Sequence, residues 1–527
     1  MIKITNQKYY VVLFLALSLL IMLFHYQFFY GGYFGYDDIE YIKLAKDIIF
    51  GTYKIDNNLY SYRWTVILPL GGLYKIFGIN DFSNFIFNVI PRLLIVYFTL
   101  RLISNFTNST KLIVVLFISF LPIHLSYLEK PMPDVWIELG FLLCFSAYYG
   151  LKYLQYKNKY SVIQFTIGAI IIFLAKETFL VLYPFFLILF VFDIKSKKNI
   201  SFWKGTVIAL ASFLIFYFLG FYISTGNAFA RINAIFQNRY LGSCSYDLLP
   251  LNVLIDRIAF MLWFDLIRNG FLIPIGFFVL LFEKNLKPQY RFILWSTISM
   301  LLLSNFMTIL YTSYSPLSYD ARHYMFLIPL LALTFSIGIE NYNLLSTKDI
   351  IIVSIALFFQ LIVSYLMHYE NVWYYYIPLI ICFIYYHFYQ NRVRFFIILS
   401  ITLMEPFIQL MHYNTTIYYE EQKQIFEIIK NENNTPYRIV TDPCNTELGK
   451  FYIKYQLGKA QIIEFKGFTP EMRRNHSTKT YIVLNGYTAF LANIRWDDYP
   501  DYVHNFENTM IKHFKNKGGE IFLWKHE

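Results

Sequence analysis

Residues 9–48 read YYVVLFLALSLLIMLFHYQFFYGGYFGYDDIEYIKLAKDI, an apolar run followed by a glycine-containing turn and two adjacent carboxylates. The run from Tyr9 to Tyr30 is long enough to cross a bilayer as a helix. It exceeds the apolar core of a signal peptide and no small-residue cleavage site follows it, so we interpret it as a retained signal anchor. The chain is therefore expected to enter a membrane near its start and to present Asp37 and Asp38 at the membrane surface.

The composition predicts the same environment for the rest of the chain. The 527 residues are 57% hydrophobic, 21% aromatic and 15% charged, with a mean hydropathy of +0.44. A soluble protein carries about 25% charged residues, so we predict an integral membrane protein. The net charge of +11 would suit nucleic acid, but Lys and Arg also accumulate in the cytoplasmic loops of membrane proteins. We favour the second explanation and expect no nucleic-acid partner.

Hydropathy predicts about thirteen membrane-spanning helices. With the N-terminus in the cytoplasm, basic residues concentrate in predicted cytoplasmic loops at 152–159, 195–204, 284–291 and 392–394, which agrees with the positive-inside rule. An odd number of spans places the C-terminal part on the opposite, periplasmic or extracellular, side. The predicted spans are 9–30, 84–103, 111–127, 134–153, 161–175, 177–192, 205–223, 270–282, 291–311, 323–340, 350–368, 372–389 and 395–411.

Two segments on the predicted outer side are long. The segment 31–83 contains the acid pair, whereas 224–269 is too polar to span a membrane and too aromatic for a free linker. Ordered loops of this length usually form lids or binding surfaces. With the spans, these two segments make up a predicted transmembrane catalytic domain over 1–411.

From about His412 the charge density rises and the pattern changes. A helix is predicted near 419–431, and strand-like runs occur at YRIVTD, QIIEF, TYIVLN and EIFLW. We therefore expect 412–527 to form a small soluble extracytoplasmic α/β domain with a mainly parallel sheet. It contains neither a P-loop nor a GxGxxG motif, so we assign it no nucleotide chemistry.

Ionisable residues gather at the predicted outer ends of the spans. Carboxylates are costly near hydrocarbon unless they have a partner or a function. A carboxylate among cations can accept a proton from a nucleophile while the cations hold an anionic group. A phosphate on a lipid fits, because Arg binds phosphate in a two-pronged manner and Lys as a point charge. The candidates are the carboxylates Asp37, Asp38 and Asp134 and the cations Arg63, Lys176 and Arg322.

Each candidate also has a structural interpretation. Asp37 or Asp38 can cap the helix that follows the first span, and Asp134 can cap a later one. Lys176 can belong to an ion pair within a turn, and Arg322 can extend to lipid headgroups. These alternatives remain open at the level of sequence.

Metal chemistry is not indicated by the sequence. The four cysteines form no CxxC motif and no Cys/His cluster. His124 and His323 are more often core or interface histidines than metal ligands. We therefore leave the metal and any other cofactor unknown; a divalent metal is compatible with the candidates but is not required by them.

The order of the motifs resembles the GT-C glycosyltransferases of the protein O-mannosyltransferase and aminoarabinose-transferase type. The similarity covers roughly 30–340, and thirteen spans with an outer C-terminal domain also match the aminoarabinose-transferase architecture. The motifs are YDDIEYIKLAKDI at 36–48, YRWTVILPLGGLYKIFG at 62–78, PMPD at 131–134, LAKET at 174–178 and RHYMFLIPLLAL at 322–333.

This resemblance implies roles for the candidates. Asp37 matches the proposed catalytic base, Asp38 is the second acid of the pair, and Asp134 matches the acid that opens the fourth span. The resemblance also implies a lipid-phosphate-binding set, Arg63, Lys176 and Arg322. Where this chain has Arg63 followed by Trp and Thr, the family more often has Lys-Pro-Pro, so Arg63 is the nearest match to the basic residue of that loop.

The resemblance further implies an inverting transfer of a sugar from a polyprenyl-phosphate donor to a hydroxyl on a protein, lipid or polysaccharide acceptor. The reaction would take place at the extracytoplasmic face, and the cytoplasmic positive bias together with the compact tail favours a bacterial inner membrane. Three alternatives remain: a ligase or polymerase that uses a lipid-pyrophosphate donor, a lipid or solute transporter, and a membrane-anchored binding protein with a functional soluble tail. A transporter would place ionisable residues near mid-membrane, whereas most of these lie at the ends of spans.

Overall fold

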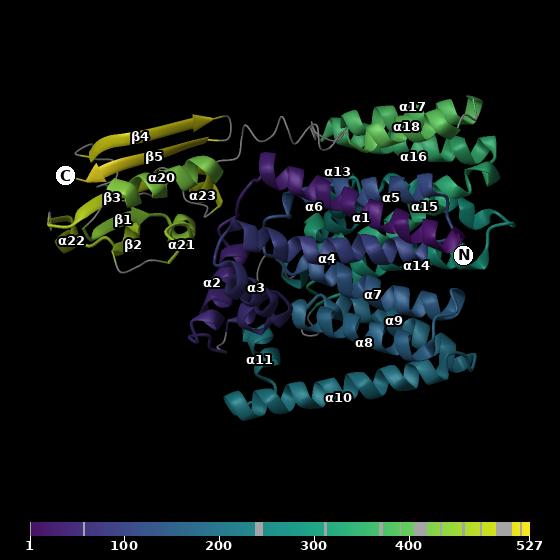
Figure 1. Ribbon diagram of the computed structural model, residues 1–527, viewed down its shortest axis with the longest axis horizontal. Coiled ribbons are helices and arrows are strands. Elements are labelled where there is room, and N and C mark those ends of the chain that lie inside the picture. Colours follow the sequence, from purple (N-terminus) through teal and green to yellow (C-terminus); the bar gives the residue numbers. More distant parts are fainter. Residues whose placement is uncertain are drawn as a thin grey trace.

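Helices run side by side along the long axis of the molecule, and a small sheet domain lies beyond one end of them (Figure 1). The structure is a computed structural model that describes residues 2–526 apart from 56–57, 238–245, 310–313, 368–372, 390–391, 405–418, 433–434, 456–458, 475–476, 492–507 and 517–518. The first helices are α1 (Ile2–Phe28), α2 (Asp37–Ile49), η1 (Leu59–Tyr62), α3 (Trp64–Phe77), α4 (Asp81–Leu102), α5 (Asn108–Phe120), α6 (Pro122–Ser126), α7 (Asp134–Tyr153), α8 (Asn158–Ala175), α9 (Phe179–Lys195) and α10 (Ile200–Thr225).

The second part of the helical region contains both long and short elements, among them a π-helical turn. They are α11 (Ala230–Gln237), η2 (Tyr246–Leu248), α12 (Leu251–Asp256), the π-helical η3 (Arg257–Met261), α13 (Leu262–Arg268), η4 (Ile273–Phe282), α14 (Pro288–Phe306), η5 (Ala321–Leu327), α15 (Ile328–Glu340), η6 (Tyr342–Leu344), α16 (Thr347–Leu366), α17 (Trp373–Tyr389) and α18 (Arg392–Leu403).

The chain is a polytopic helical membrane protein. Within the described residues, seven helices are long and apolar enough to cross a membrane, or eight if the bent pair Leu251–Arg268 and Ile273–Phe282 is one span. Four further apolar helices are shorter, over Trp64–Phe77, Asn108–Phe120, Tyr376–His387 and Val393–Leu403. The count of thirteen therefore stays a prediction, because several of the predicted spans correspond to helices shorter than a bilayer normally requires.

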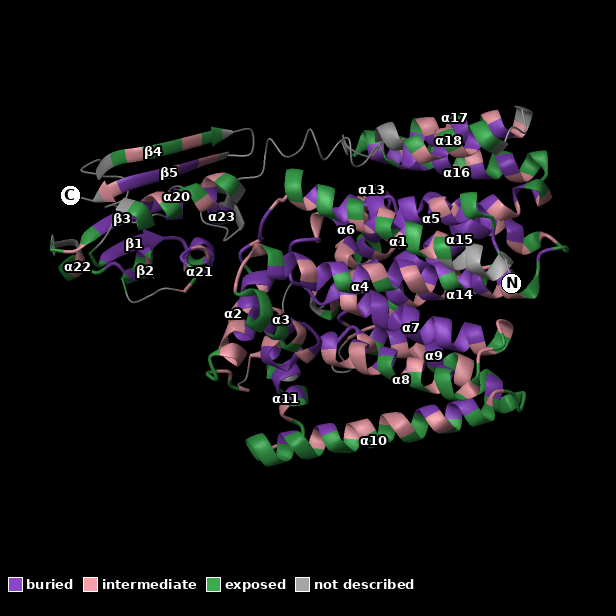
Figure 2. Ribbon diagram, in the orientation of Figure 1, coloured by how far each residue is buried: buried purple, intermediate pink, exposed green. Residues whose placement is uncertain are grey.

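Burial separates a central layer from a peripheral one. In α7, 89% of the most apolar stretch is buried within the protein, against 17% in α10, which lies at the outer edge of the bundle in Figure 1. Figure 2 shows the same contrast, with α7 mostly buried and α10 mostly exposed or intermediate. An apolar helix with so little protein contact is suited to face lipid. The functional site is built on the central helices instead.

The C-terminal domain is an α/β domain with a mixed five-stranded sheet in the order β2-β1-β3-β5-β4. The strands β2, β1 and β3 are parallel to one another, whereas β5 pairs antiparallel with both β3 and β4. The prediction of a mainly parallel sheet is thus wrong for the half that ends in a hairpin. The elements are α20 (Tyr419–Glu432), β1 (Tyr437–Thr441), α21 (Pro443–Tyr452), β2 (Ala460–Glu464), η8 (Phe465–Gly467), α22 (Pro470–Arg474), β3 (Lys479–Asn485), α23 (Gly486–Leu491), β4 (Asn508–Asn516) and β5 (Gly519–His526).

The C-terminal domain contacts the segment that leads from α1 into α2. Leu448 and Phe451 of α21 belong to the same buried cluster as Tyr33, and the rings of Tyr33 and Phe451 are 5.0 Å apart. Lys423 of α20 lies 3.7 Å from Asp81 at the start of α4. The domain therefore packs directly against the turn that holds the acid pair. The predicted boundary between 411 and 412 lies outside the described residues.

Candidate functional site

A cavity of about 270 Å³ lies where α2, η1, the turn between α8 and α9, and η5 meet. Four of the six predicted site residues line it: Asp37, Arg63, Lys176 and Arg322. They come from segments that are far apart in the sequence, so tertiary packing gathers them. Figure 1 shows α2 and α3 at the end of the bundle beside the C-terminal domain, which places this cavity at one end of the helices.

Asp37 is the first residue of α2, and its carboxylate faces the cavity. The Tyr60 hydroxyl donates a hydrogen bond of 2.6 Å to Oδ1, and Oδ2 lies 3.9 Å from Nη1 of Arg322. Burial raises the pKa of Asp37, but the Tyr60 hydrogen bond and the three cations of the cavity outweigh burial and hold the pKa below its ordinary value. The carboxylate is therefore ionised at neutral pH, with Oδ1 bonded to Tyr60 and Oδ2 on the side of Arg322.

Asp38 does not line the cavity. It is fully buried, and its two oxygens accept hydrogen bonds of 2.5–3.1 Å from the backbone N–H groups of Phe34, Gly35, Tyr36 and Ile39. A carboxylate with several N–H donors fixes the turn that precedes α2. The sequence left open whether each acid caps the helix or acts in the site. Asp38 has the geometry of a residue that supports the turn, whereas Asp37 is accessible from the cavity.

Arg63 is held by a buried ion pair that the sequence did not predict. Its Nη2 lies 3.1 Å from Oε2 of Glu177, and Arg231 from α11 lies 3.9 Å from the other oxygen of the same carboxylate. Arg63 also donates to the Tyr41 hydroxyl and stacks over the ring of Tyr60 at 4.8 Å. Glu177 thus ties η1, the α8–α9 turn and α11 together. Arg63 is at the cavity wall, but much of its charge is already matched.

Lys176, Asp134 and His323 form a second buried group. Oδ1 of Asp134, at the start of α7, lies 3.8 Å from Nζ of Lys176 and 3.4 Å from Nδ1 of His323. The Lys176 nitrogen is also 3.1 Å from Nδ1 of His323. Asp134 is 4% exposed and sits behind the two cavity-lining residues. It therefore supports the cavity from within the bundle.

Arg322 is the most accessible of the three predicted cations, with 23% of its side chain exposed. Its Nε lies 3.1 Å from Asp320 in addition to the contact with Asp37. Asp320 also accepts a hydrogen bond of 3.0 Å from the Arg322 backbone N–H, which starts η5. Arg322 is thus oriented by two partly exposed carboxylates and can still reach an anion in the cavity.

Among the residues that the structure describes, the charges around the cavity are balanced. Four carboxylates face four cations, and each cation lies within 4.0 Å of at least one carboxylate. An incoming phosphate must therefore compete with a carboxylate for its cations. The eight groups are Asp37, Asp134, Glu177, Asp320, Arg63, Lys176, Arg231 and Arg322.

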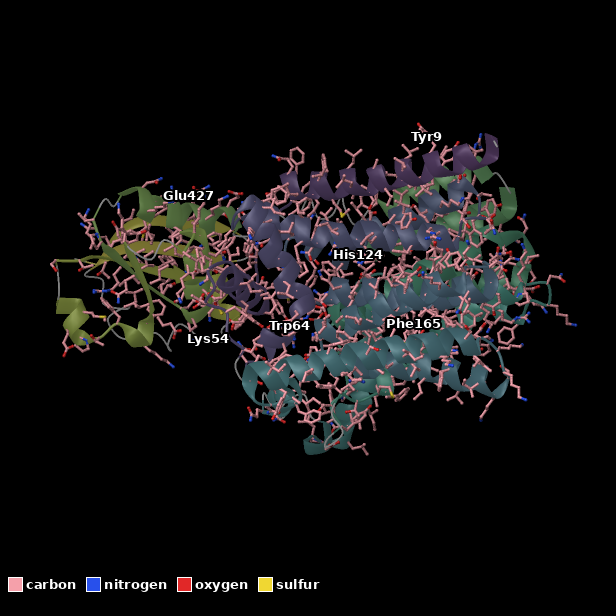
Figure 3. All side chains as sticks on the ribbon, turned by 60° about the horizontal axis from the view of Figure 1, so that its bottom comes forward. Tyr9, Lys54, Trp64, His124, Phe165 and Glu427 are labelled. Carbon is pink, nitrogen blue, oxygen red and sulfur yellow. The ribbon has the colours of Figure 1, made fainter. Side chains whose placement is uncertain are left out.

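His124 has a structural position inside the bundle, where Figure 3 labels it. Its Nδ1 donates to the carbonyl oxygen of Ile118 at 2.8 Å, and its Nε2 lies 2.9 Å from Glu138. His124 is thus a core histidine, as the sequence favoured over a metal ligand. Across the residues that the structure describes, no three His, Cys, Asp or Glu side chains are grouped to hold a metal ion.

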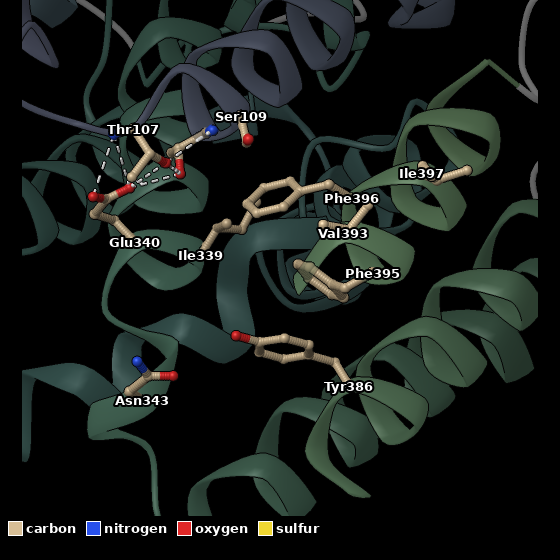
Figure 4. A pocket seen from close by; sticks show the side chains of 11 residues that line it. Thr107, Ser109, Ile339, Glu340, Asn343, Tyr386, Val393, Phe395, Phe396 and Ile397 are labelled. Atoms are coloured by element: carbon tan, nitrogen blue, oxygen red, sulfur yellow. Dashed lines mark hydrogen bonds between the residues drawn. The ribbon is translucent and has the colours of Figure 1, made fainter. Parts of the chain in front are cut away.

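A second cavity, of about 350 Å³, lies at the α4–α5 turn and the facing ends of α15, α17 and α18 (Figure 4). Its single lining carboxylate, Glu340, accepts hydrogen bonds from the Thr107 and Thr110 hydroxyls, at 3.1 and 2.7 Å, and from the Thr107 backbone N–H. These contacts anchor the start of α5. Although larger, this cavity has no grouping of acids and bases among its lining residues, so we place the candidate active site in the first cavity.

The sequence did not single out two site residues, Tyr60 and Arg231, and it indicated Glu177 only as a turn residue beside Lys176. Arg231 left a signal, because a basic residue in a predicted outer segment departs from the positive-inside pattern. No sequence signal distinguishes Tyr60 from the many other tyrosines. None distinguishes Glu177 from an ordinary carboxylate in a turn. Their roles depend on packing between distant segments.

Comparisons with known proteins agree with this architecture. No protein-family model matches the sequence, and no curated protein matches it significantly. Two crystal structures of ArnT from Cupriavidus metallidurans do match in fold, one bound to undecaprenyl phosphate and one in the apo state. The chain has the GT-C fold of ArnT. The TM-score is 0.59 for both structures at 12% sequence identity, and the match covers 98% and 99% of this chain and 98% of each ArnT chain.

The extent of the match matters because it includes the C-terminal domain. The resemblance that the motifs predicted over roughly 30–340 thus holds, at the level of fold, for nearly the whole chain. At this identity the match to ArnT shows the fold alone. The chemistry therefore has to be argued from the residues that line the cavity.

Proposed function

We propose that this protein is a membrane glycosyltransferase that moves a sugar from a polyprenyl-phosphate donor to an acceptor hydroxyl. The observation that carries the proposal is that Asp37, Lys176 and Arg322 line one cavity at the end of an ArnT-like bundle. One carboxylate beside partly accessible cations is the arrangement that this transfer needs. The ArnT structure bound to undecaprenyl phosphate supports the choice of donor.

In the proposed reaction, Asp37 is the general base. Its Oδ2 accepts the proton of the acceptor hydroxyl while the acceptor oxygen attacks the anomeric carbon. The bond from that carbon to the phosphate oxygen breaks, and its electron pair stays with the phosphate. Attack from the face opposite the leaving phosphate inverts the configuration. Tyr60 would hold the other carboxylate oxygen and keep Asp37 oriented.

The cations would stabilise the departing lipid phosphate, which gains a second negative charge as the bond breaks. Arg322 can bind it with two N–H groups, and Lys176 can add a point charge. Arg63 would act from the cavity wall, because Glu177 already matches part of its charge. Asp134 would lie behind Lys176 rather than touch the substrate.

The same charge balance favours a lipid phosphate over a lipid pyrophosphate as donor. Within the described part of the chain, every cation at the cavity already faces a carboxylate. A second phosphate group would add negative charge without a further cation among these described residues to receive it. We therefore keep the pyrophosphate-dependent ligase as the alternative and rank it second.

We place the reaction at the extracytoplasmic face of a bacterial inner membrane, with the N-terminus in the cytoplasm. The basic cytoplasmic loops predicted from the sequence support this orientation. The C-terminal domain then lies outside the cytoplasm, against the turn before α2. There it would border the route by which a protein, lipid or polysaccharide acceptor reaches the cavity.

The test is an in-vitro transfer assay with purified protein and a panel of polyprenyl-phosphate sugars. Release of free polyprenyl phosphate is followed by mass spectrometry, with and without envelope extract as a source of acceptors. We expect release by the wild type and a loss of about 100-fold or more in Asp37→Asn, since a positioned base contributes about 10²–10⁴.

Asp47→Asn is the matched control. Asp47 lies on the same helix and pairs with Lys46 outside the cavity, so this variant should keep the wild-type rate. Equal rates in wild type and Asp37→Asn would remove Asp37 as the base. Release from pyrophosphate-linked sugars alone would favour the ligase.

A further inference from the structure

His323 shares one nitrogen between a cation and an anion. Its Nδ1 lies 3.1 Å from Nζ of Lys176 and 3.4 Å from Oδ1 of Asp134. A lysine ammonium has three N–H donors and no acceptor. Nδ1 must therefore accept from Lys176 in this arrangement, so the imidazole is neutral and carries its single proton on Nε2.

This arrangement conflicts with the binding of a phosphate. A phosphate in the cavity attracts the Lys176 ammonium, which at present also faces Asp134 at 3.8 Å. Asp134 is 4% exposed, and a buried carboxylate that loses its cation is left as an uncompensated buried charge, which is strongly unfavourable. Binding of the donor would thus leave the buried Asp134 carboxylate without a cation unless another cation takes the place of Lys176.

We propose that His323 takes up one proton when the lipid phosphate binds and replaces Lys176 as the partner of Asp134. The proton comes from solvent and bonds to Nδ1, while Nε2 keeps its own. The imidazolium then donates from Nδ1 to Oδ1 of Asp134, and Lys176 is released to the phosphate. This proposal rests on the proposed function, because it requires a phosphate in the cavity.

The change also restores the charge balance of the cavity. The phosphodiester of a polyprenyl-phosphate sugar brings one negative charge, and protonation of His323 adds one positive charge. Removal of the Lys176 ammonium from 3.1 Å takes away the nearest like charge and so favours the imidazolium. His323 is accordingly a positioning residue that couples donor binding to proton uptake.

Charged groups on several elements face His323. Asp134 from α7 favours the imidazolium, whereas Lys176 from the α8–α9 turn and Arg322 from the same element, η5, oppose it. Asp265 on α13 instead accepts from the backbone N–H of Ala321. Among the described residues, Asp134 and Lys176 are the two groups that contact Nδ1, so a movement of Lys176 decides which of them Nδ1 bonds to.

The test uses farnesyl methyl phosphate, a singly charged phosphodiester that has no sugar to transfer and does not titrate near neutral pH. Binding to the detergent-solubilised full chain is measured by calorimetry in buffers of different ionisation enthalpy, between pH 6 and 8.5. We expect uptake of up to one proton per bound probe. Affinity should then weaken as pH rises, by at most about tenfold per pH unit.

His323→Gln is the decisive variant, because glutamine can accept from Lys176 and donate to Asp134 but cannot take up a proton. It should bind the probe with no proton uptake and little pH dependence. His513→Gln, in the C-terminal hairpin beside Glu520, should keep the wild-type uptake. Uptake that persists in His323→Gln would overturn the proposal.

The wild type alone also distinguishes the two proposals, whether or not the variant folds. Binding of the probe by the wild type without proton uptake would overturn the role of His323 and leave the proposed function intact. Failure of the folded wild type to bind the probe at any pH would instead count against a lipid-phosphate donor, and both proposals would fall together.

Discussion

Asp37 and Asp38 are adjacent in the chain, but their carboxylates have opposite surroundings. Asp37 faces the cavity with a hydrogen bond from Tyr60, whereas Asp38 is fully buried and accepts from four backbone N–H groups. Asp38 therefore stabilises the turn that orients Asp37 toward the cavity. The division explains how a pair of carboxylates can sit together, since Arg322 faces one of them and backbone N–H groups surround the other.

Asp38→Asn should destabilise the protein. An asparagine has one acceptor oxygen, and its NH₂ group would point at backbone donors, so at least part of the N–H set would lose its acceptor. Hydrogen bonds to a charged group contribute about 1.5–3 kcal/mol each to stability. We expect a loss of roughly 2 kcal/mol or more in the free energy of unfolding, measured by thermal unfolding in detergent. An unchanged midpoint would contradict the supporting role of Asp38.

Tyr60→Phe should change the pH dependence of transfer. Among the groups that lower the pKa of Asp37, the Tyr60 hydrogen bond is the first, so its removal raises that pKa. A general base acts when ionised, which means that activity falls as pH drops through its pKa. The acidic limb of the rate profile should lie below the ordinary aspartate range in the wild type and move to higher pH in Tyr60→Phe. Superimposable acidic limbs would mean that another group limits the rate.

Local features of the sequence predicted the helices and the ends at which ionisable residues gather. Apolar runs and loop charges are properties of neighbouring residues, so they can be read without a structure. The pairing of Glu177 with Arg63 and Arg231 could not, because it joins three segments separated by long stretches of chain. The edge strand β4 was missed as well, since NTMIKHFKN at 508–516 has no regular apolar alternation to mark a buried face.

Glu177→Gln should destabilise the protein strongly. The substitution leaves two buried guanidinium groups, those of Arg63 and Arg231, without the carboxylate between them. Breaking a buried ion pair by removal of one partner costs about 3–5 kcal/mol. The free energy of unfolding should fall by that order, and the affinity for a lipid phosphate should change because Arg63 is released toward the cavity.

Glu427→Gln is a suitable control for Glu177→Gln. Glu427 lies on the exposed side of α20, where a single charge contributes little. Its unfolding midpoint should match the wild type. If both variants unfold alike, the buried network around Glu177 does not stabilise the fold.

Gly35→Ala should lower both stability and transfer. Gly35 has φ +91°, a backbone conformation that L residues rarely adopt, and a Cβ there would lie 3.2 Å from Cδ1 of Leu448 in α21. Such strain costs about 1–3 kcal/mol. The Gly35 N–H also donates to Asp38, so relief of the strain would shift the turn and move Asp37. We expect a lower unfolding midpoint together with a lower transfer rate in the assay with polyprenyl-phosphate sugars.

Gly72→Ala is the matched comparison for Gly35→Ala. Gly72 lies within α3, and a Cβ there would meet no atom within 4 Å. Alanine favours a helix over glycine by about 1 kcal/mol, so Gly72→Ala should raise the unfolding midpoint slightly and leave the rate unchanged. A Gly35→Ala variant as active as Gly72→Ala would show that the contact between the C-terminal domain and this turn does not position Asp37. A loss confined to Gly35→Ala would instead assign to α21 a part in holding the base.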